Sequence, residues 1–173
     1  MSASIIDDMN SHVSVVELTD DQWQRYRDIR LASLEHDGAA FGGNLESERE
    51  FTESQWRQKA LTYVALVAVV NDRDIGVMTV ENLKGDFGAT CWIGGCWVHP
   101  DYRKIGALRS LFAYADTHAA ARQWSVQGLG VWIDNYAAIA AYEKLGFVKK
   151  GDPQNSTRKP GLFYQRMIRQ AAS

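Results

Sequence analysis

The sequence is poor in cysteine, which limits the chemistry open to it. Only 2 of the 173 residues are cysteine, Cys91 and Cys96, and they stand on one expected strand. Because side chains alternate along a strand, we expect the two to point to opposite faces and to form no disulfide with each other. Neither has metal-ligand spacing with a histidine or a second cysteine pair, so we expect no metal site and a reducing, cytoplasmic setting.

An excess of basic residues is also missing. The sequence has 19 Lys and Arg against 21 Asp and Glu, a formal net charge of -2 and a pI near 6.1. Binding to nucleic acid or to an anionic membrane usually requires a broad basic surface. We therefore expect neither of these partners.

The sequence has no apolar run of membrane-spanning length. The longest candidate, residues 63–70, suits a buried strand. Residues 1–12 contain two aspartates and neither a basic region nor an apolar core, so they predict a flexible tail and not a signal peptide. With 46% hydrophobic residues and six tryptophans, residues 13–173 can bury one sizeable core, and we expect a single domain.

Hydrophobic periodicity predicts an α/β (α+β) fold. Capping boxes beginning at Thr19 and Thr52 predict two helix starts, while Asn135 and Gly146 predict the start and end of another. We expect strands at residues 13–18, 63–70, 75–81, 89–98, 125–133, 147–150 and 162–168, and helices at 19–35, from 52, at 106–122 and at 136–145. Residues 37–50 predict a loop that could become helical in its late part. This order fits a mixed sheet of six or seven strands with helices on both faces.

The stretch from Val98 to Phe112 combines a strand end, a basic turn and a helix start. Exposed N–H groups at a helix start, the glycine at position 106 and the cations of the turn suit a polyphosphate. An ordinary connection between a strand and a helix could have the same sequence. The turn alone therefore does not distinguish a polyphosphate site from such a connection. Gly94-Gly95 lies inside the preceding strand and predicts a bulge there or just after it.

Three motifs resemble those of the GNAT superfamily of N-acetyltransferases. VHPDYRKIGAL, residues 98–108, is similar to its acetyl-CoA signature V-x-P-x-x-R-G-x-G-x-G. VWIDNYAAIAAYEKLGFVKKG, residues 131–151, is similar to its strand followed by N-x-x-A and A-x-x-x-Y-x-x-x-G-F. RLASLEHDGAAFGGNLESE, residues 30–48, weakly resembles a stretch of many bacterial members. The resemblance implies a sheet splayed at an acetyl-CoA site.

Two positions depart from the first motif. Lys104 replaces a glycine of the turn, and Leu108 stands where glycine or alanine is usual. A leucine there either turns its side chain into the core or crowds the cofactor. The apolar face of Leu108, Leu111, Phe112 and Ala115 favours the first outcome.

The resemblance also implies roles for single residues. Backbone N–H groups of the turn would bind the pyrophosphate, the Val98 N–H would donate to the thioester carbonyl, and Tyr142 would protonate the leaving thiolate. Asn135 would both cap its helix and contact the cofactor. The implied cofactor-binding set is Trp97, Val98, Arg103, Lys104, Ile105, Gly106, Ala107, Leu108, Arg109, Asn135 and Tyr142.

The general base is harder to place. Glu81, at the end of its strand, is the first candidate, although it would equally suit a solvent-facing hairpin. Glu46 and Glu48 could instead line the acceptor pocket, or form part of a solvated face. A lone histidine such as His99 is more often a surface or core residue than a base. Cys96 would need a base beside it to act as a nucleophile.

The expected function is transfer of an acetyl group from acetyl-CoA to a primary amine of a small molecule or peptide, by direct attack through a tetrahedral intermediate. The alternative is a non-catalytic GNAT-like module that binds CoA or a partner. The acceptor is not disclosed, and the aromatic content would allow a homodimer.

Overall fold

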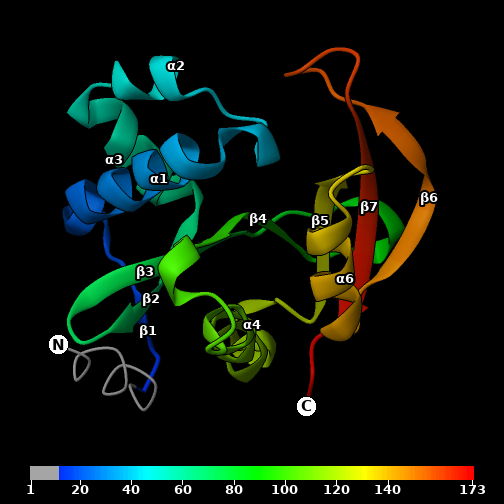
Figure 1. The fold of residues 1–173 in the computed structure, drawn as a ribbon. Helices are drawn as coiled ribbons and strands as arrows, with labels where there is room; N and C mark the ends of the chain where they lie inside the picture. The colour runs from blue at the N-terminus through cyan, green and yellow to red at the C-terminus, as the bar shows by residue number, and fades with distance from the viewer. Residues whose placement is uncertain (1–11) are drawn as a thin grey trace, which may run out of the picture.

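A seven-stranded sheet runs through the whole molecule in the order β1-β2-β3-β4-β5-β7-β6 (Figure 1). The computed structural model describes residues 12–173, so nearly all of the predicted tail lies outside the described residues. The strands are β1 Ser14–Glu17, β2 Val64–Val70, β3 Arg73–Glu81, β4 Cys91–Val98, β5 Val126–Trp132, β6 Val148–Asn155 and β7 Phe163–Gln170. The helices are α1 Trp23–Asp37, α2 Leu45–Arg49, α3 Glu53–Thr62, α4 Ala107–Thr117, α5 Ala119–Arg122 and α6 Tyr136–Lys144.

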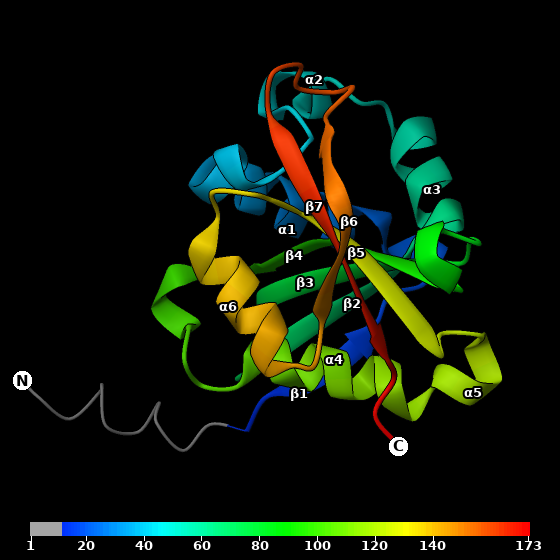
Figure 2. The ribbon, with the colours of Figure 1, turned by 90° about the vertical axis from the view of Figure 1, so that its right-hand side faces the viewer.

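Helices cover both faces of this sheet, which confirms the predicted fold class. Helices α1 and α3 bury their aromatic residues, among them Trp23, Tyr26 and Trp56, against one face. Helices α4 and α6 pack on the other face, where Phe112 and Ile139 join the larger core cluster. Figure 2 shows α1 and α3 on the opposite side of the sheet from α4. Within residues 12–173, no helix is long and apolar enough to cross a bilayer.

The predicted helix starts match local hydrogen bonds. The Thr52 hydroxyl accepts from the Gln55 N–H at 3.3 Å, and the Gln55 side chain accepts from the Thr52 N–H at 2.8 Å. The Asn135 side chain accepts from the Ala138 N–H at 3.2 Å. Each bond satisfies a donor that the first helical turn leaves without a backbone partner.

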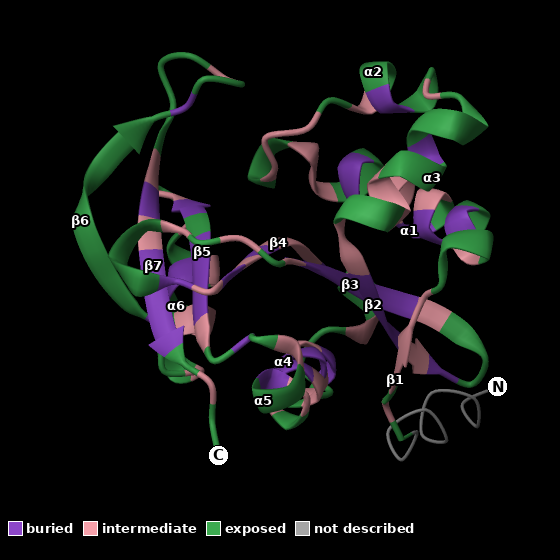
Figure 3. Cartoon of the chain, turned by 180° about the vertical axis from the view of Figure 1, so that it is seen from behind, coloured by how far each residue is buried: buried purple, intermediate pink, exposed green. Residues whose placement is uncertain are grey.

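The late part of the loop expected at 37–50 is helical, which the prediction allowed: it forms α2, whose first turn is capped by Asn44 accepting from the Ser47 N–H. Other element boundaries differ from the prediction. The helix expected at 106–122 divides at His118 into α4 and α5. Strand β6 continues through Pro153 to Asn155 and is exposed along its whole length (Figure 3). It is an edge strand, where a proline removes no hydrogen bond that a neighbour needs.

The predicted bulge in β4 is confirmed, and it splays the sheet. Thr79 pairs with Gly94 and Val77 with Trp97, so Gly95 and Cys96 together face the single residue between them on β3. Gly95 has φ +59°, which lies in the left-handed region that favours glycine. Pairing of β4 with β5 ends at Ile93. Beyond this point, no strand of residues 12–173 pairs with β4 on its β5 side.

The bulge also corrects the prediction for the cysteines. Because the extra residue inverts the alternation of side chains, Cys91 and Cys96 both lie on the α4 side of β4, against the larger core cluster. Both thiols are free, as expected.

Candidate active site

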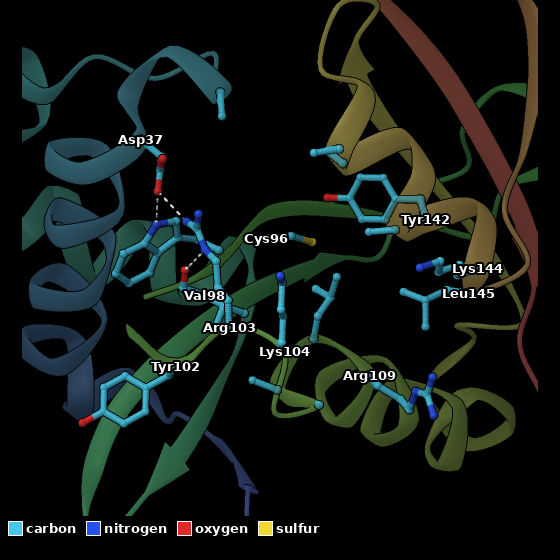
Figure 4. Close-up of a pocket in the computed structure, with 18 of the residues that line it drawn as sticks. Asp37, Cys96, Val98, Tyr102, Arg103, Lys104, Arg109, Tyr142, Lys144 and Leu145 are labelled. Carbon is cyan, nitrogen blue, oxygen red and sulfur yellow. Dashed lines mark hydrogen bonds and ion pairs between the residues drawn. The ribbon is translucent and has the colours of Figure 1, made fainter. Parts of the chain in front are cut away.

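A cavity of about 760 Å³ opens where β4 leaves β5, between α4 and α6. Figure 4 shows Cys96 and Val98 of β4, Arg109 of α4 and Tyr142 of α6 around it. The structure brings all eleven sequence-predicted cofactor-binding residues to the walls of this one cavity, namely Trp97, Val98, Arg103, Lys104, Ile105, Gly106, Ala107, Leu108, Arg109, Asn135 and Tyr142. These residues come from three separate parts of the chain, so the fold creates the cavity by bringing them together.

The turn before α4 has a backbone that few residues adopt. Gly106 has φ +89° and Lys104 has φ +67°. A Cβ atom at Gly106 would meet nothing within 4 Å, so the requirement there is conformational and not steric. The N-cap of α4 is Gly106, and no side chain in the described part of the chain caps this helix start. The N–H groups of its first turn are therefore available to an anionic group in the cavity.

Arg103 lines the cavity but is already engaged by the protein. Its Nε donates to the Val98 carbonyl at 2.9 Å, and its Nη2 donates to Asp37 at 2.7 Å. Asp37 also accepts from the Trp97 indole N–H at 2.7 Å. This clamp fixes the end of α1 against β4 and the turn. Asp37 was missed because its partners lie 60 and 66 positions away in the sequence.

Other cations of the cavity are free to meet a ligand. Lys104, Arg109 and Lys144 line it and have no ion pair among residues 12–173. Lys144 was also missed by the sequence reasoning. It could have been predicted from its position two residues after Tyr142, in the last turn of the helix that begins after Asn135.

Leu108 combines the two outcomes considered for it, which were packing into the core and facing the cofactor. Ala107, Leu111, Phe112 and Ala115 form the buried face of α4, and Ala107 replaces Leu108 in the predicted face. Leu108 is half-buried, contacts the larger core cluster and also lines the cavity. It therefore adds an apolar patch to the cavity wall while part of the side chain packs against the core.

Tyr142 and Cys96 line the same cavity. The Tyr142 ring packs edge-on to Phe112 and Phe147 with centroid distances of 6.3 and 5.8 Å. Burial raises the pKa of the Cys96 thiol to about 12, although its interaction with the Tyr142 hydroxyl opposes this. Burial, followed by the nearby thiol, raises the pKa of Tyr142 well above its usual value. Both groups hold their protons at neutral pH, so Cys96 is a poor nucleophile there.

A second cavity of about 510 Å³ lies beyond the bulge. It shares Ala40 and Phe41 with the first cavity, and Gly94 and Gly95 of the bulge line it. Its other walls carry aromatic and charged side chains, which are Trp92, Trp132, Tyr164, Asp86, Arg158 and Arg166. The bulge therefore separates two adjoining spaces.

The residues considered for the general base and for the acceptor pocket do not gather at either cavity. Glu81 pairs with Trp92 at the end of β3 and is not among the lining residues of the two cavities. Glu48 is buried in a two-point ion pair with Arg30, with both N–O distances 2.9 Å. Glu46 is exposed. The His99 ring accepts from the Asp101 N–H and packs near Trp97. The structure gives none of the four a contact with the cavities.

The splayed sheet and its cavity define the class of the protein as an α/β protein with a ligand site where β4 leaves β5. Comparison with family models then shows which family it is. The model of the acetyltransferase (GNAT) family matches residues 16–147, so the chain belongs to this family. This confirms the resemblance found in the motifs. A search of curated protein sequences gave no match.

Solved structures share the fold over nearly the whole chain. An acetyltransferase of the GNAT family from Streptococcus pneumoniae superposes with a TM-score of 0.71 at 17% identity, covering 93% of this chain and 100% of that one. The yncA protein of Salmonella typhimurium, solved with its cofactor acetyl-CoA, has a TM-score of 0.67 at 20% identity and covers 94% and 96%. The ribosomal-protein-S18-alanine N-acetyltransferase of Escherichia coli has a TM-score of 0.65 at 17% identity and covers 94% and 96%.

Proposed function

We propose that this protein transfers the acetyl group of acetyl-CoA to a primary amine of a small molecule or peptide. The observation that carries the proposal is that the free edge of β4, the uncapped start of α4 and the Tyr142 hydroxyl face one cavity. A separate cavity for the acceptor adjoins it at the bulge. Family membership and the acetyl-CoA bound to the Salmonella protein support the choice of cofactor.

The residues of the first cavity suit acetyl-CoA in both charge and shape. The N–H groups of the Lys104 to Ala107 turn and of α4, together with Lys104, Arg109 and Lys144, would hold its phosphates. The free edge of β4 would pair with its extended amide-containing arm, much as an added strand pairs with a sheet edge. Leu108 would then contact the apolar part of the bound molecule.

The Val98 N–H is the proposed donor to the thioester carbonyl. The His99 N–H donates to the Ile75 carbonyl of β3 at 2.7 Å, so the Val98 groups, which point the other way, face the cavity. The Arg103 bond to the Val98 carbonyl from that side is consistent with this direction. A fixed backbone donor would stabilise the charge that develops on the carbonyl oxygen during attack.

Proton transfer completes the proposed reaction. The amine nitrogen attacks the acetyl carbon to give the tetrahedral intermediate, and the carbon–sulfur bond then breaks as Tyr142 gives its proton to the sulfur. The nitrogen loses one proton to water, and one proton from water restores the Tyr142 hydroxyl. The cavities contain two carboxylates, Asp37 and Asp86, and each is paired with an arginine. The acceptor amine would therefore react in its neutral form, with water removing its proton. Glu81 could assist only through water.

Replacing Tyr142 by Phe tests this mechanism. We expect kcat to fall about 100-fold, because a positioned general acid contributes at least that much, while the Kd for acetyl-CoA stays within about threefold. Tyr136→Phe is the matched control, since Tyr136 is 76% exposed on the same helix and outside both cavities. Turnover equal to that of the parent would remove Tyr142 from the mechanism.

The partial exposure of Leu108 to the cavity favours one second candidate, a module that binds CoA without catalysis. Calorimetry and a thiol-release assay on the same sample separate the two. Binding of acetyl-CoA with no thiol release across a broad amine panel would favour the module. No heat at high micromolar acetyl-CoA would contradict both candidates.

A further inference from the structure

The second cavity has more positive than negative charge. Two guanidinium groups, Arg158 and Arg166, line it, but Asp86 is the one carboxylate among its lining residues. Asp86 is paired with Arg166. Arg158 is exposed and has no ion pair or hydrogen bond from its side chain within residues 12–173. The cavity thus offers one unneutralised cation to an anionic group of the acceptor.

Aromatic rings form the floor of the same cavity. A Cβ atom at Gly128 of β5 would lie 2.7 Å from the Trp92 ring, and one at Gly130 would lie 3.1 Å from the Tyr164 ring. Gly128 is therefore required for space, and a side chain at Gly130 would press on the Tyr164 ring, so these two glycines let rings from the neighbouring strands lie across β5. With Trp132, these rings make a broad apolar surface of the kind on which flat groups stack.

The arrangement of these features suits the three groups of an α-amino acid. Gly94 and Gly95 bring the cavity to the bulge, where the thioester would lie beyond Cys96. A Cβ atom at Gly42 would lie 3.3 Å from the Arg158 side chain, and the preceding Phe41 lines both cavities. The free cation therefore stands near the junction, while the aromatic floor extends away from it. Arg30, beneath Gly95, is neutralised by Glu48 and does not compete for the anion.

We propose that the acceptor is an α-amino acid with a flat, apolar side chain, held by its carboxylate at Arg158 and by its side chain on the Trp92, Trp132 and Tyr164 rings. This inference rests on the proposed acetyl transfer and names its substrate class. Its amine would lie at the bulge, next to the thioester. Acetylation would give an N-acetyl amino acid and free CoA thiol.

A matched acceptor series tests the carboxylate. Thiol release from acetyl-CoA would be followed with tryptophan, tryptophan amide, tryptamine and alanine. We expect kcat/KM for tryptophan to exceed that for the amide and for tryptamine by about 10- to 100-fold, the range of a charge-assisted hydrogen bond. Amidation lowers the pKa of the amine and so raises its neutral fraction. A preference for tryptophan over the amide would therefore run against the supply of neutral amine. Alanine should be at least about 10-fold poorer than tryptophan, since it lacks the ring.

Arg158→Gln links this preference to the proposed residue. The variant should lower kcat/KM for tryptophan to about the level of the amide and leave the amide rate within about twofold. Arg57→Gln is the matched control, because Arg57 lies on α3, outside both cavities, and its one ion pair is with exposed Glu53. It should leave both rates unchanged.

The outcomes separate the inference from the proposed function. Equal rates with the acid and the amide, an unchanged preference in Arg158→Gln, or a better rate with peptides that lack a free carboxylate would overturn the inference while acetyl transfer stood. Absence of acetyl-CoA binding by calorimetry, with no thiol release for any acceptor, would overturn both.

Discussion

At the scale of single residues, Lys104 carries opposing demands. It lies in the left-handed region, with φ +67°, where a residue with a side chain is strained by about 1 kcal/mol. Its side chain is also one of the free cations that line the first cavity, which is the proposed acetyl-CoA site and is called the cofactor cavity below. Compared with the glycine that is usual at this position, the lysine adds a positive charge to the cavity but strains the backbone of the turn.

Two substitutions at Lys104 separate strain from charge. Lys104→Gly should raise the free energy of unfolding by about 0.5–1 kcal/mol, because glycine adopts this φ freely. Lys104→Gln keeps the strain and should leave stability nearly unchanged. Both should weaken acetyl-CoA binding by about 3- to 10-fold through the lost charge. Denaturant unfolding and calorimetry measure the two effects, and a glycine variant less stable than the glutamine variant would contradict the assignment of strain.

The residue types at the cofactor cavity could be predicted, but the state of each side chain could not. The motif predicted that Arg103, Lys104 and Arg109 lie near the phosphates, and the structure places all three on the walls of one cavity. Only the fold shows that Arg103 is held by Asp37 and the Val98 carbonyl, because Asp37 belongs to a distant helix. Ion pairs between distant segments leave no periodic signal in a sequence. This is also why Glu48, which pairs with Arg30, was considered for the acceptor pocket.

At the scale of elements, β1 is a short edge strand that depends on one carboxylate. Glu17 accepts from the Arg122 guanidinium at 2.9 and 3.1 Å and from the Tyr114 hydroxyl at 3.0 Å. These contacts join β1 to α4 and α5. Burial alone would raise the pKa of Glu17, but the hydrogen bonds from Arg122 and Tyr114 outweigh it and lower the pKa below its usual 4.5.

Glu17→Gln should lower the free energy of unfolding by about 1 kcal/mol at pH 7, since a partly exposed pair is screened by solvent. Because the folded-state pKa is lowered, this contribution is fully present above about pH 4.5 and is lost as the pH falls through the folded value. The difference between parent and variant should therefore shrink in acid. Urea unfolding from pH 7 to pH 3 measures it, and a difference that grew in acid would show that the sign is wrong.

Strand patterns in the sequence predicted the sheet but not every boundary. Gly94-Gly95 was sufficient to predict the bulge, because glycine inside a strand has few other uses. The side-chain alternation past the bulge was missed, and with it the shared face of Cys91 and Cys96. Strand β6 was predicted too short because exposed edge residues such as Lys149 and Pro153 carry no hydrophobic period.

At the scale of the whole molecule, a buried polar network joins the two walls of the cofactor cavity. Arg169 of β7 donates to Asp116 of α4 at 2.5 Å, to Gln127 of β5 at 2.9 Å and to the Leu145 carbonyl at the end of α6 at 2.9 Å. The side chains of Arg169 and Asp116 are 6% and 13% exposed. Since α4 and α6 carry the turn and Tyr142, the network helps to fix the width of the cavity.

Breaking this network should destabilise the whole domain. Asp116→Asn leaves the buried guanidinium without its counter-charge and should lower the free energy of unfolding by about 3 kcal/mol or more. Adding Arg169→Met should recover part of this loss, because the uncompensated charge is then gone. Glu53→Gln, which removes an exposed ion pair with Arg57, is the control and should cost less than about 1 kcal/mol. Denaturant unfolding of the four proteins gives the comparison, and an Asp116→Asn loss no larger than that of Glu53→Gln would mean that the sheet and helices hold the cavity without this ion pair.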